Sequence, residues 1–226
     1  GRYRNLCDQV VETCKLKRMS VDDIKKHVGV TNLEVVEELY ERQKSLFFAF
    51  PHSGNWEWFG KRMQTLSGHH PMAIYKKVKN PDFEKFIYEL RTSLPVEMIE
   101  SDAALRTLAR RSGTLDAVLI LADQTSFGLE SDYWNRFLNQ ETCWFTGLER
   151  MSKFLDYAVV FVDMKRQGRG QYALTFHLVT DEPKSTGKGE IMEQYSRHIE
   201  RFIHEQPDNW LWSHRRWKHV RKQGEA

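Results

Sequence analysis

The sequence contains few cysteines and no long apolar run. Its three cysteines are Cys7, Cys14 and Cys143, so at least one stays unpaired, and no CxxC spacing occurs. This pattern indicates neither a disulfide framework nor a zinc site and favours a reducing compartment. No apolar run approaches the ~18 residues of a transmembrane helix, and no signal peptide opens the chain. As written, the sequence predicts a soluble polypeptide.

An excess of one charge is also missing. Lys and Arg number 34 against 31 Asp and Glu, which gives a formal net charge of +3 over 226 residues. So small an excess does not indicate a nucleic-acid binder, and we expect no nucleic-acid partner. Hydrophobic residues make up 40% and aromatic residues 12% of the chain. This composition excludes a disordered or collagen-like chain and is typical of a globular protein with a sizeable core.

The hydrophobic pattern predicts helices before residue 45 and alternating strands and helices after it. Ser20 fits an N-cap, and Thr31 to Glu34 fits a capping box ahead of a helix over 33–43. Strands are predicted at 45–50, 72–75, 96–99, 117–122, 158–163 and 172–179, and helices at 56–66, 81–93, 102–111, 147–155 and 189–205. The last two strands predict an antiparallel hairpin at one sheet edge. We therefore expect an α/β fold in a single domain, 1–226: an N-terminal helical cap (1–44) and a core (45–226) with a mostly parallel central sheet flanked by helices.

The most informative segment is the turn after the first strand of this core. His52 follows a buried strand, Gly54 allows a tight turn, and a helix begins near Asn55. His52 therefore lies at the C-terminal end of a parallel strand, where open α/β sheets bind their ligands. If the carboxylate of Glu57 accepted the proton of one ring nitrogen, the other nitrogen would be free to act as a base. Alternatively, His52 is an ordinary strand-end histidine and Glu57 stabilises the start of its helix.

Four motifs, in order, resemble one protein family. His52-Ser-Gly-Asn-Trp-Glu57 resembles the HxxxxD/E motif of glycerolipid acyltransferases and, more closely, the HxGNWE form of late (secondary) lipid A acyltransferases of Gram-negative bacteria. A second block places Arg106 upstream of a hydrophobic strand that ends in Asp123-Gln124. The third and fourth are Phe137 to Thr142 with Gly147-Leu-Glu149, and the ending Trp210-Leu-Trp-Ser-His214-Arg-Arg-Trp217-Lys, similar to the family's W-x-H-R-R-W/F-K close. The resemblance covers residues 5–218.

The resemblance implies transfer of a fatty acyl group from an acyl carrier protein thioester to a hydroxyl of a lipid A precursor, at the cytoplasmic face of the bacterial inner membrane. His52 would be the general base and Glu57 would orient it, because a hydroxyl attacks a thioester poorly unless a base removes its proton. No metal or cofactor is implied. The residues expected to bind substrate are Asn55, Arg106, Asp123, Gln124 and Glu149.

Simpler roles stay open for several of these residues. Arg106 also fits a solvated arginine on an amphipathic helix, Gln124 a turn cap, and Glu149 a partner for the first turn of its helix. The same chemistry could act on another membrane lipid, such as a phospholipid or an aminolipid, and a non-catalytic membrane-surface protein is a further alternative. Family members begin with a membrane-anchoring helix that this chain lacks, and removal of a leading segment before Gly1 would explain the difference.

Aromatic and basic residues alternate near the C-terminus. Trp210, Trp212 and Trp217 are interspersed with His214 and several Arg and Lys residues. Such a pattern is typical of a membrane interface, although the same tryptophans could pack inside. Basic clusters at 76–79 (Lys76, Lys77, Lys79) and 165–169 (Lys165, Arg166, Arg169) could receive an acidic carrier protein, or be ordinary solvated surface. The expected partners are therefore an acyl carrier protein, a lipid acceptor and a membrane surface.

Overall fold

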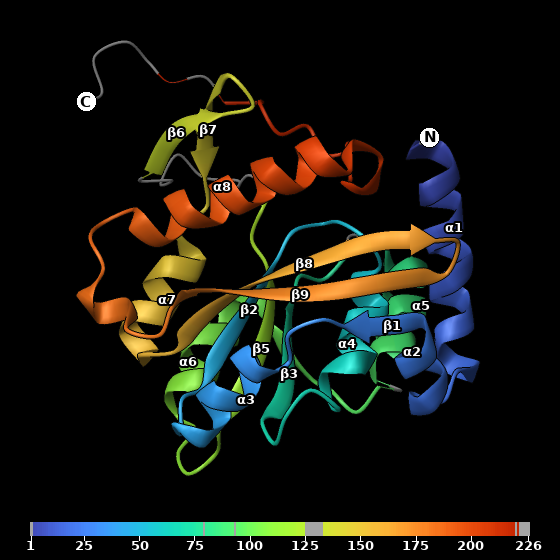
Figure 1. Cartoon of the computed structure of the whole chain (residues 1–226), viewed down its shortest axis with the longest axis horizontal. Helices are drawn as coiled ribbons and strands as arrows, with labels where there is room; N and C mark the ends of the chain where they lie inside the picture. The colour runs from blue at the N-terminus through green and yellow to red at the C-terminus, as the bar shows by residue number, and fades with distance from the viewer. Residues whose placement is uncertain (1, 79, 93, 125–132, 220, 222–226) are drawn as a thin grey trace.

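The computed structural model describes residues 2–78, 80–92, 94–124, 133–219 and 221 (Figure 1). Its central sheet has seven strands in the order β1-β9-β8-β2-β5-β3-β4. Most neighbours are parallel, whereas β9 runs antiparallel to β8 and carries β1 parallel to itself. The predicted α/β fold with a mostly parallel sheet is thus confirmed. The strands are β1 (Val28–Val30), β2 (Leu46–Phe50), β3 (His70–Tyr75), β4 (Glu97–Glu100), β5 (Asp116–Leu121), β8 (Ala158–Gly168) and β9 (Gln171–Thr180).

Helices flank the sheet on both faces (Figure 1). They are α1 (Arg2–Lys15), α2 (Val21–His27), α3 (Glu34–Glu41), α4 (Trp56–Met63), α5 (Pro81–Thr92), α6 (Ala104–Ala109), α7 (Gly147–Leu155) and α8 (Glu190–Glu205). The 3₁₀ turns lie at Leu16–Arg18, Ser101–Ala103, Pro183–Ser185 and Pro207–Asn209. The predicted helices over 56–66 and 102–111 are shorter than expected, and residue 93, the predicted end of α5, lies outside the described residues.

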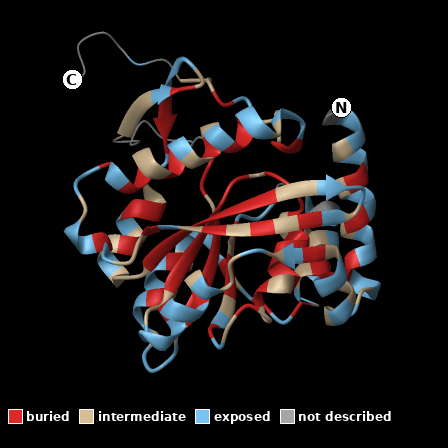
Figure 2. Cartoon of the chain, viewed as in Figure 1, coloured by how far each residue is buried: buried red, intermediate tan, exposed pale blue. Residues whose placement is uncertain are grey.

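The core is divided by the sheet into two apolar clusters. Side chains alternate along β2, because successive residues of a strand point to opposite faces. Phe48 and Phe50 pack with residues of α2 to α5, whereas Phe47 and Ala49 pack with residues of α6 to α8. The strands in the middle of the molecule are accordingly buried on both sides (Figure 2). This burial explains why β2 is a continuous apolar run in the sequence.

The N-terminal region contains one confirmed helix cap and one that does not form. The Ser20 hydroxyl accepts the Asp23 backbone N–H at 3.1 Å, as predicted for the start of α2. The predicted capping box at Thr31 does not form. Leu33 is the N-cap of α3, and the Thr31 hydroxyl donates to Leu174 O at 3.0 Å. Thr31 is thereby held beside β9 as the chain leaves β1, the short strand that the sequence pattern did not predict. The predicted hairpin β8–β9 consequently has β1 beyond it and does not form the sheet edge.

A small antiparallel sheet, β6 (Tyr133–Phe137) and β7 (Gln140–Trp144), was also not predicted. Leu138 and Asn139 connect the strands with φ angles of 47° and 63°, the conformation of a tight two-residue hairpin. This hairpin lies beyond α8 on the side away from β1 and α3 (Figure 1). Among the helices that the structure describes, none is long and apolar enough to cross a membrane.

Candidate active site

The candidate site begins where β2 ends. β2 lies between β5 and β8 in the sheet, and residues 51–55 connect it to α4. This turn places His52 at the C-terminal end of the parallel strands, as predicted. The His52 side chain is 17% exposed, so the ring is held by its surroundings yet can still be reached from outside.

The carboxylate that holds this ring belongs to Asp123. Asp123 follows β5, the neighbour of β2. Phe50 is in register with Leu121, so the segments that follow these two strands leave the same edge of the sheet side by side. Asp123 Oδ1 lies 2.5 Å from His52 Nδ1, and its Oδ2 accepts the His52 backbone N–H at 3.1 Å. Asp123 was predicted as a substrate-binding residue, but its side chain is only 3% exposed and both oxygens contact His52. It is therefore placed to orient the histidine.

The Asp123 carboxylate is ionised in this environment. Burial alone would raise the pKa of its carboxyl group, but the nearby His52 and the hydrogen bonds from His52 and Trp210 outweigh burial and hold that pKa below its usual value. A carboxylate at Nδ1 keeps the proton on that nitrogen. The neutral ring then presents Nε2 as an acceptor, which is the form that a general base requires.

Glu57, which we expected to orient His52, binds other groups. Arg91 Nε lies 3.2 Å and 3.1 Å from the two Glu57 carboxylate oxygens, and Arg91 Nη2 lies 2.5 Å from Oε1. The Trp56 indole also donates to Glu57 at 3.1 Å, and the Trp56 ring packs edge-on against the His52 ring at 5.4 Å. The first turn of α4 thus directs Glu57 toward α5, where it forms an ion pair. We expected Glu57 to supply the carboxylate at His52 Nδ1. In the structure Asp123 supplies it.

Asn55 and Glu149, two predicted substrate-binding residues, form hydrogen bonds within the protein. Asn55 is the N-cap of α4: its side chain accepts from Trp58 N at 3.1 Å and donates to Glu12 at 2.9 Å. Glu149 accepts the Gly189 N–H at 2.7 Å and the Lys153 ammonium at 3.1 Å. Glu149 therefore stabilises the start of α8, because a carboxylate favours the positive end of a helix. The geometry gives both residues structural roles, and their contact with substrate stays a prediction.

Arg106 and Gln124 complete the predicted set. Arg106 is exposed on α6, a helix that contacts β4 and α7, so the structure does not bring it to His52. This position matches the alternative of a solvated arginine. Gln124 is half-buried directly after Asp123 and is the last described residue before the segment 125–132.

The sequence interpretation missed the role of the C-terminal tryptophans at this site. Trp210 is buried and its indole N–H donates to Asp123 Oδ2 at 2.9 Å. The Trp217 indole donates to Thr142 Oγ1 at 2.8 Å, and the Trp212 indole donates to Pro207 O at 2.6 Å. The tryptophans thus pack onto the protein. Their spacing in the sequence contained no signal for the contact with Asp123, which lies 87 residues away.

A buried arginine, Arg216, lies near Asp123. Arg216 is 3% exposed, and its guanidinium lies 4.3 Å from the centre of the Trp144 ring. Burial lowers the pKa of Arg216 to about 10, which still leaves it charged at neutral pH. Arg216 and Asp123 interact electrostatically, so the ionised Asp123 has a buried cation near it in addition to the histidine.

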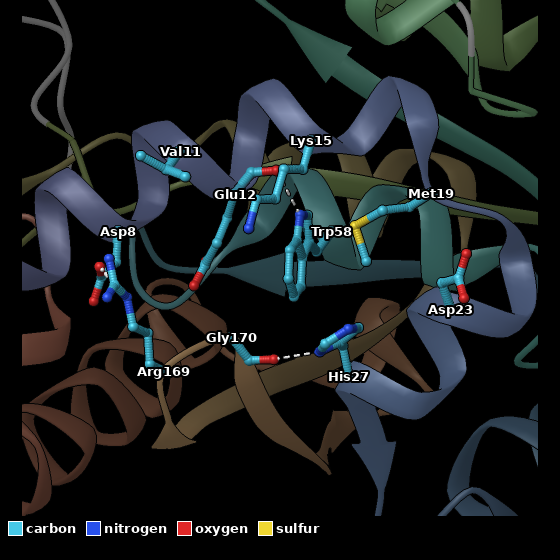
Figure 3. A pocket seen from close by; sticks show the side chains of 10 residues that line it. All are labelled: Asp8, Val11, Glu12, Lys15, Met19, Asp23, His27, Trp58, Arg169 and Gly170. Atoms are coloured by element: carbon cyan, nitrogen blue, oxygen red, sulfur yellow. Dashed lines mark hydrogen bonds and ion pairs between the residues drawn. The ribbon is translucent and has the colours of Figure 1, made fainter.

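A separate cavity of about 550 Å³ lies between α1, α2, α4 and the β8–β9 turn (Figure 3). Glu12, His27 and Trp58 contribute to its walls. Neither His52 nor Asp123 lines it. This cavity therefore does not belong to the histidine site.

Comparison with known proteins decides the family. The model of the bacterial lipid A biosynthesis acyltransferases matches residues 2–219, which includes all four sequence motifs. The chain belongs to this family. No curated protein matches the chain. Membership in the lipid A biosynthesis acyltransferase family implies an acyl donor and a lipid acceptor, and it associates the protein with a bacterial membrane.

Proposed function

We propose that this acyltransferase moves a fatty acyl group from the thioester of an acyl carrier protein to a hydroxyl of a lipid A precursor, with His52 as the general base. The observation that carries the proposal is the 2.5 Å contact between His52 Nδ1 and the buried Asp123. A partly exposed histidine with an ionised carboxylate behind it is the arrangement that general-base catalysis uses.

In the proposed reaction, His52 Nε2 takes the proton of the acceptor hydroxyl as its oxygen attacks the thioester carbonyl carbon. The new C–O bond gives a tetrahedral intermediate, and its collapse breaks the C–S bond. The imidazolium then returns the proton to the carrier thiolate, so the base is regenerated. Asp123 stabilises the imidazolium between these two steps. The positive end of α4, which begins four residues after His52, faces the developing oxyanion in this scheme.

Glu57 takes a positioning role in this scheme. Its ion pair with Arg91 joins α4 to α5, and both side chains are largely buried, with exposed fractions of 10% and 20%. Through the Trp56 indole, Glu57 also fixes the aromatic ring that packs against His52. It therefore supports the histidine from the helix side, while Asp123 holds it from the strand side.

The donor is proposed to transfer its acyl group directly. A thioester is already activated, so no acyl-enzyme is needed. Ser53, next to His52, is 0% exposed and Cys143 is 6% exposed, so neither is proposed as a nucleophile. Because the family acts on membrane lipids, we place the reaction at the cytoplasmic face of the inner membrane, where acyl carrier proteins are available.

Several members of the basic clusters that we expected to receive the carrier form ion pairs within the protein, while Lys79 lies outside the described residues. Lys77 lies 2.6 Å from Glu100, Lys165 lies 2.5 Å from Glu205, and Arg166 pairs with Asp8. These pairs therefore give little support to the idea that either cluster is the carrier docking site.

The experiment is acyl transfer by the purified protein, supplied with acyl carrier thioester and a lipid A precursor. His52→Ala should lower turnover by at least about 100-fold, because general-base catalysis contributes that much or more. The matched control is His70→Ala, since His70 is exposed and bonds Glu97 on the neighbouring strand. Near-normal turnover of His52→Ala would refute the proposed base.

A further inference from the structure

The turn that carries His52 is held by a segment from the far end of the chain. Leu211 N donates to His52 O at 2.8 Å, and Gly54 N donates to Asn209 O at 3.1 Å. These bonds place Ser53 and Trp210 opposite each other as an antiparallel bridge. The Asn209 side chain donates to Met164 O on β8 at 3.0 Å, which anchors the segment to the sheet. We call residues 209–211 the C-terminal clamp.

Trp210 occupies the centre of this clamp and contacts the His52–Asp123 pair, called the dyad below. Its side chain is 5% exposed and packs edge-on against Phe137 at 6.2 Å and Trp212 at 4.7 Å. The buried indole N–H donates to Asp123 Oδ2 at 2.9 Å. That oxygen also accepts the His52 backbone N–H, which leaves Oδ1 for the ring. Each carboxylate oxygen thus has its own donors.

We propose that Trp210 is a positioning residue for acyl transfer: its indole N–H fixes the rotation of the Asp123 carboxylate, and so keeps Oδ1 on His52 Nδ1. This inference rests on the proposed function, in which His52 is the base. Without the indole, Oδ2 would keep only the His52 backbone N–H at 3.1 Å, and the carboxylate would be held less firmly about its terminal bond, a torsion that is broad in free Asp side chains. The clamp removes this freedom before substrate binds, which is the way enzymes preorganise a catalytic group.

Other charged and titratable groups face the same carboxylate and would remain in a Trp210 variant. Besides His52, these are Tyr195 of α8 and His214 and Arg216, which follow the clamp. The Tyr195 hydroxyl donates to Phe50 O at 3.0 Å, and burial together with the charge of Asp123 raises its pKa well above the usual value, so it stays neutral. Loss of the indole N–H would therefore remove one donor from Asp123 and leave the surrounding charges unchanged.

The test is a double-mutant cycle in the transfer assay. Trp210→Phe keeps a buried aromatic ring and removes the N–H; it should lower kcat about 10- to 100-fold, with KM nearly unchanged, as expected for a hydrogen bond to a charged group. In an Asp123→Asn background, the same substitution should have almost no further effect, because the group through which Trp210 acts is gone. The matched control is Trp212→Phe, which removes an indole N–H from the same segment, bonded instead to Pro207 O; it should leave kcat within about twofold of wild type.

The outcomes separate the inference from the proposed function. Equal fold losses for Trp210→Phe with and without Asp123, or a loss appearing only in KM, would overturn the positioning role. If Trp210→Phe does not fold in a thermal melt, 3-benzothienylalanine at position 210 replaces it, because that residue keeps both rings and lacks the N–H; full activity of this protein would equally overturn the inference. The proposed function fails separately, when His52→Ala keeps its turnover.

Discussion

Exchange of Asp123 for Asn is the most discriminating change at the dyad, because it keeps the size of the side chain and removes its charge. Asp123 is 3% exposed and lies 2.5 Å from His52 Nδ1, so little solvent competes for the bond. A hydrogen bond to a charged group contributes about 1.5–3 kcal/mol. Since about 1.4 kcal/mol corresponds to a factor of ten in rate, this loss alone predicts a decrease of roughly 10- to 150-fold.

The amide adds a second effect, because its NH₂ group can face Nδ1 and favour the tautomer that has its proton on Nε2. We therefore expect kcat/KM of Asp123→Asn to fall by about 10²–10⁴ in the acyl transfer assay. The matched comparison is Glu57→Gln, which weakens the ion pair with Arg91 but leaves the His52–Asp123 contact. It should lower the free energy of unfolding by about 1–3 kcal/mol and lower kcat/KM by less than about tenfold.

Both variants are compared only where circular dichroism and thermal melts show a folded protein at the assay temperature. A greater loss of kcat/KM in folded Glu57→Gln than in folded Asp123→Asn would refute our interpretation. Glu57 would then be the carboxylate that matters for the base, as the motif spacing first suggested.

Three further predictions concern helix packing, acid stability and the acceptor. Glu149→Ala should lower the melting temperature by about 2–10 °C with KM unchanged, because the carboxylate stabilises the start of α8; a raised KM at an unchanged melting temperature would restore a substrate role. The lowered pKa of Asp123 means that its ionised form stabilises the fold above about pH 4, and that this stabilisation is lost as the pH falls through the lowered value. Melting temperatures of Asp123→Asn should therefore fall less steeply than those of wild type below about pH 4, and a steeper fall would contradict the assigned direction. Mass spectrometry of total lipids should show lipid A lacking one acyl chain in cells without the gene, restored by the wild-type chain; loss of a chain from a phospholipid or aminolipid would instead identify another acceptor.

The strands of the sheet could be predicted because burial on both faces leaves a direct trace in sequence. Residues 45–50 and 117–122 are continuous apolar runs, and they become the adjacent strands β2 and β5. β1 has only three residues with a central glycine, Gly29, which is too short for a periodic pattern. The β6–β7 hairpin turns at Leu138 and Asn139, and a leucine with positive φ is not a turn signal that sequence rules recognise.

The site was predictable in part for a related reason. The position of His52 follows from local sequence, since a strand, a tight turn and a helix fix it at the sheet's C-terminal edge. Which carboxylate binds the His52 ring depends on the order of the strands, because Asp123 follows the strand next to β2. The short spacing in the sequence favoured Glu57 instead. Trp210 contacts Asp123, which lies 87 residues away in the sequence. The nearby Arg215 and Arg216 favoured a membrane interface for this segment equally well. Long-range pairing of this kind leaves no periodic signal.

The clamp at residues 209–211 also has a consequence for biosynthesis. The ribosome adds the tryptophan that holds the Asp123 carboxylate more than 150 residues after the histidine, since Gly54 and Asn209, which pair in the clamp, are 155 residues apart. Over that interval a nascent polypeptide contains the base without the alignment that the base needs. A product that terminates before residue 209 lacks these contacts, so it is expected to transfer acyl groups at a strongly reduced rate.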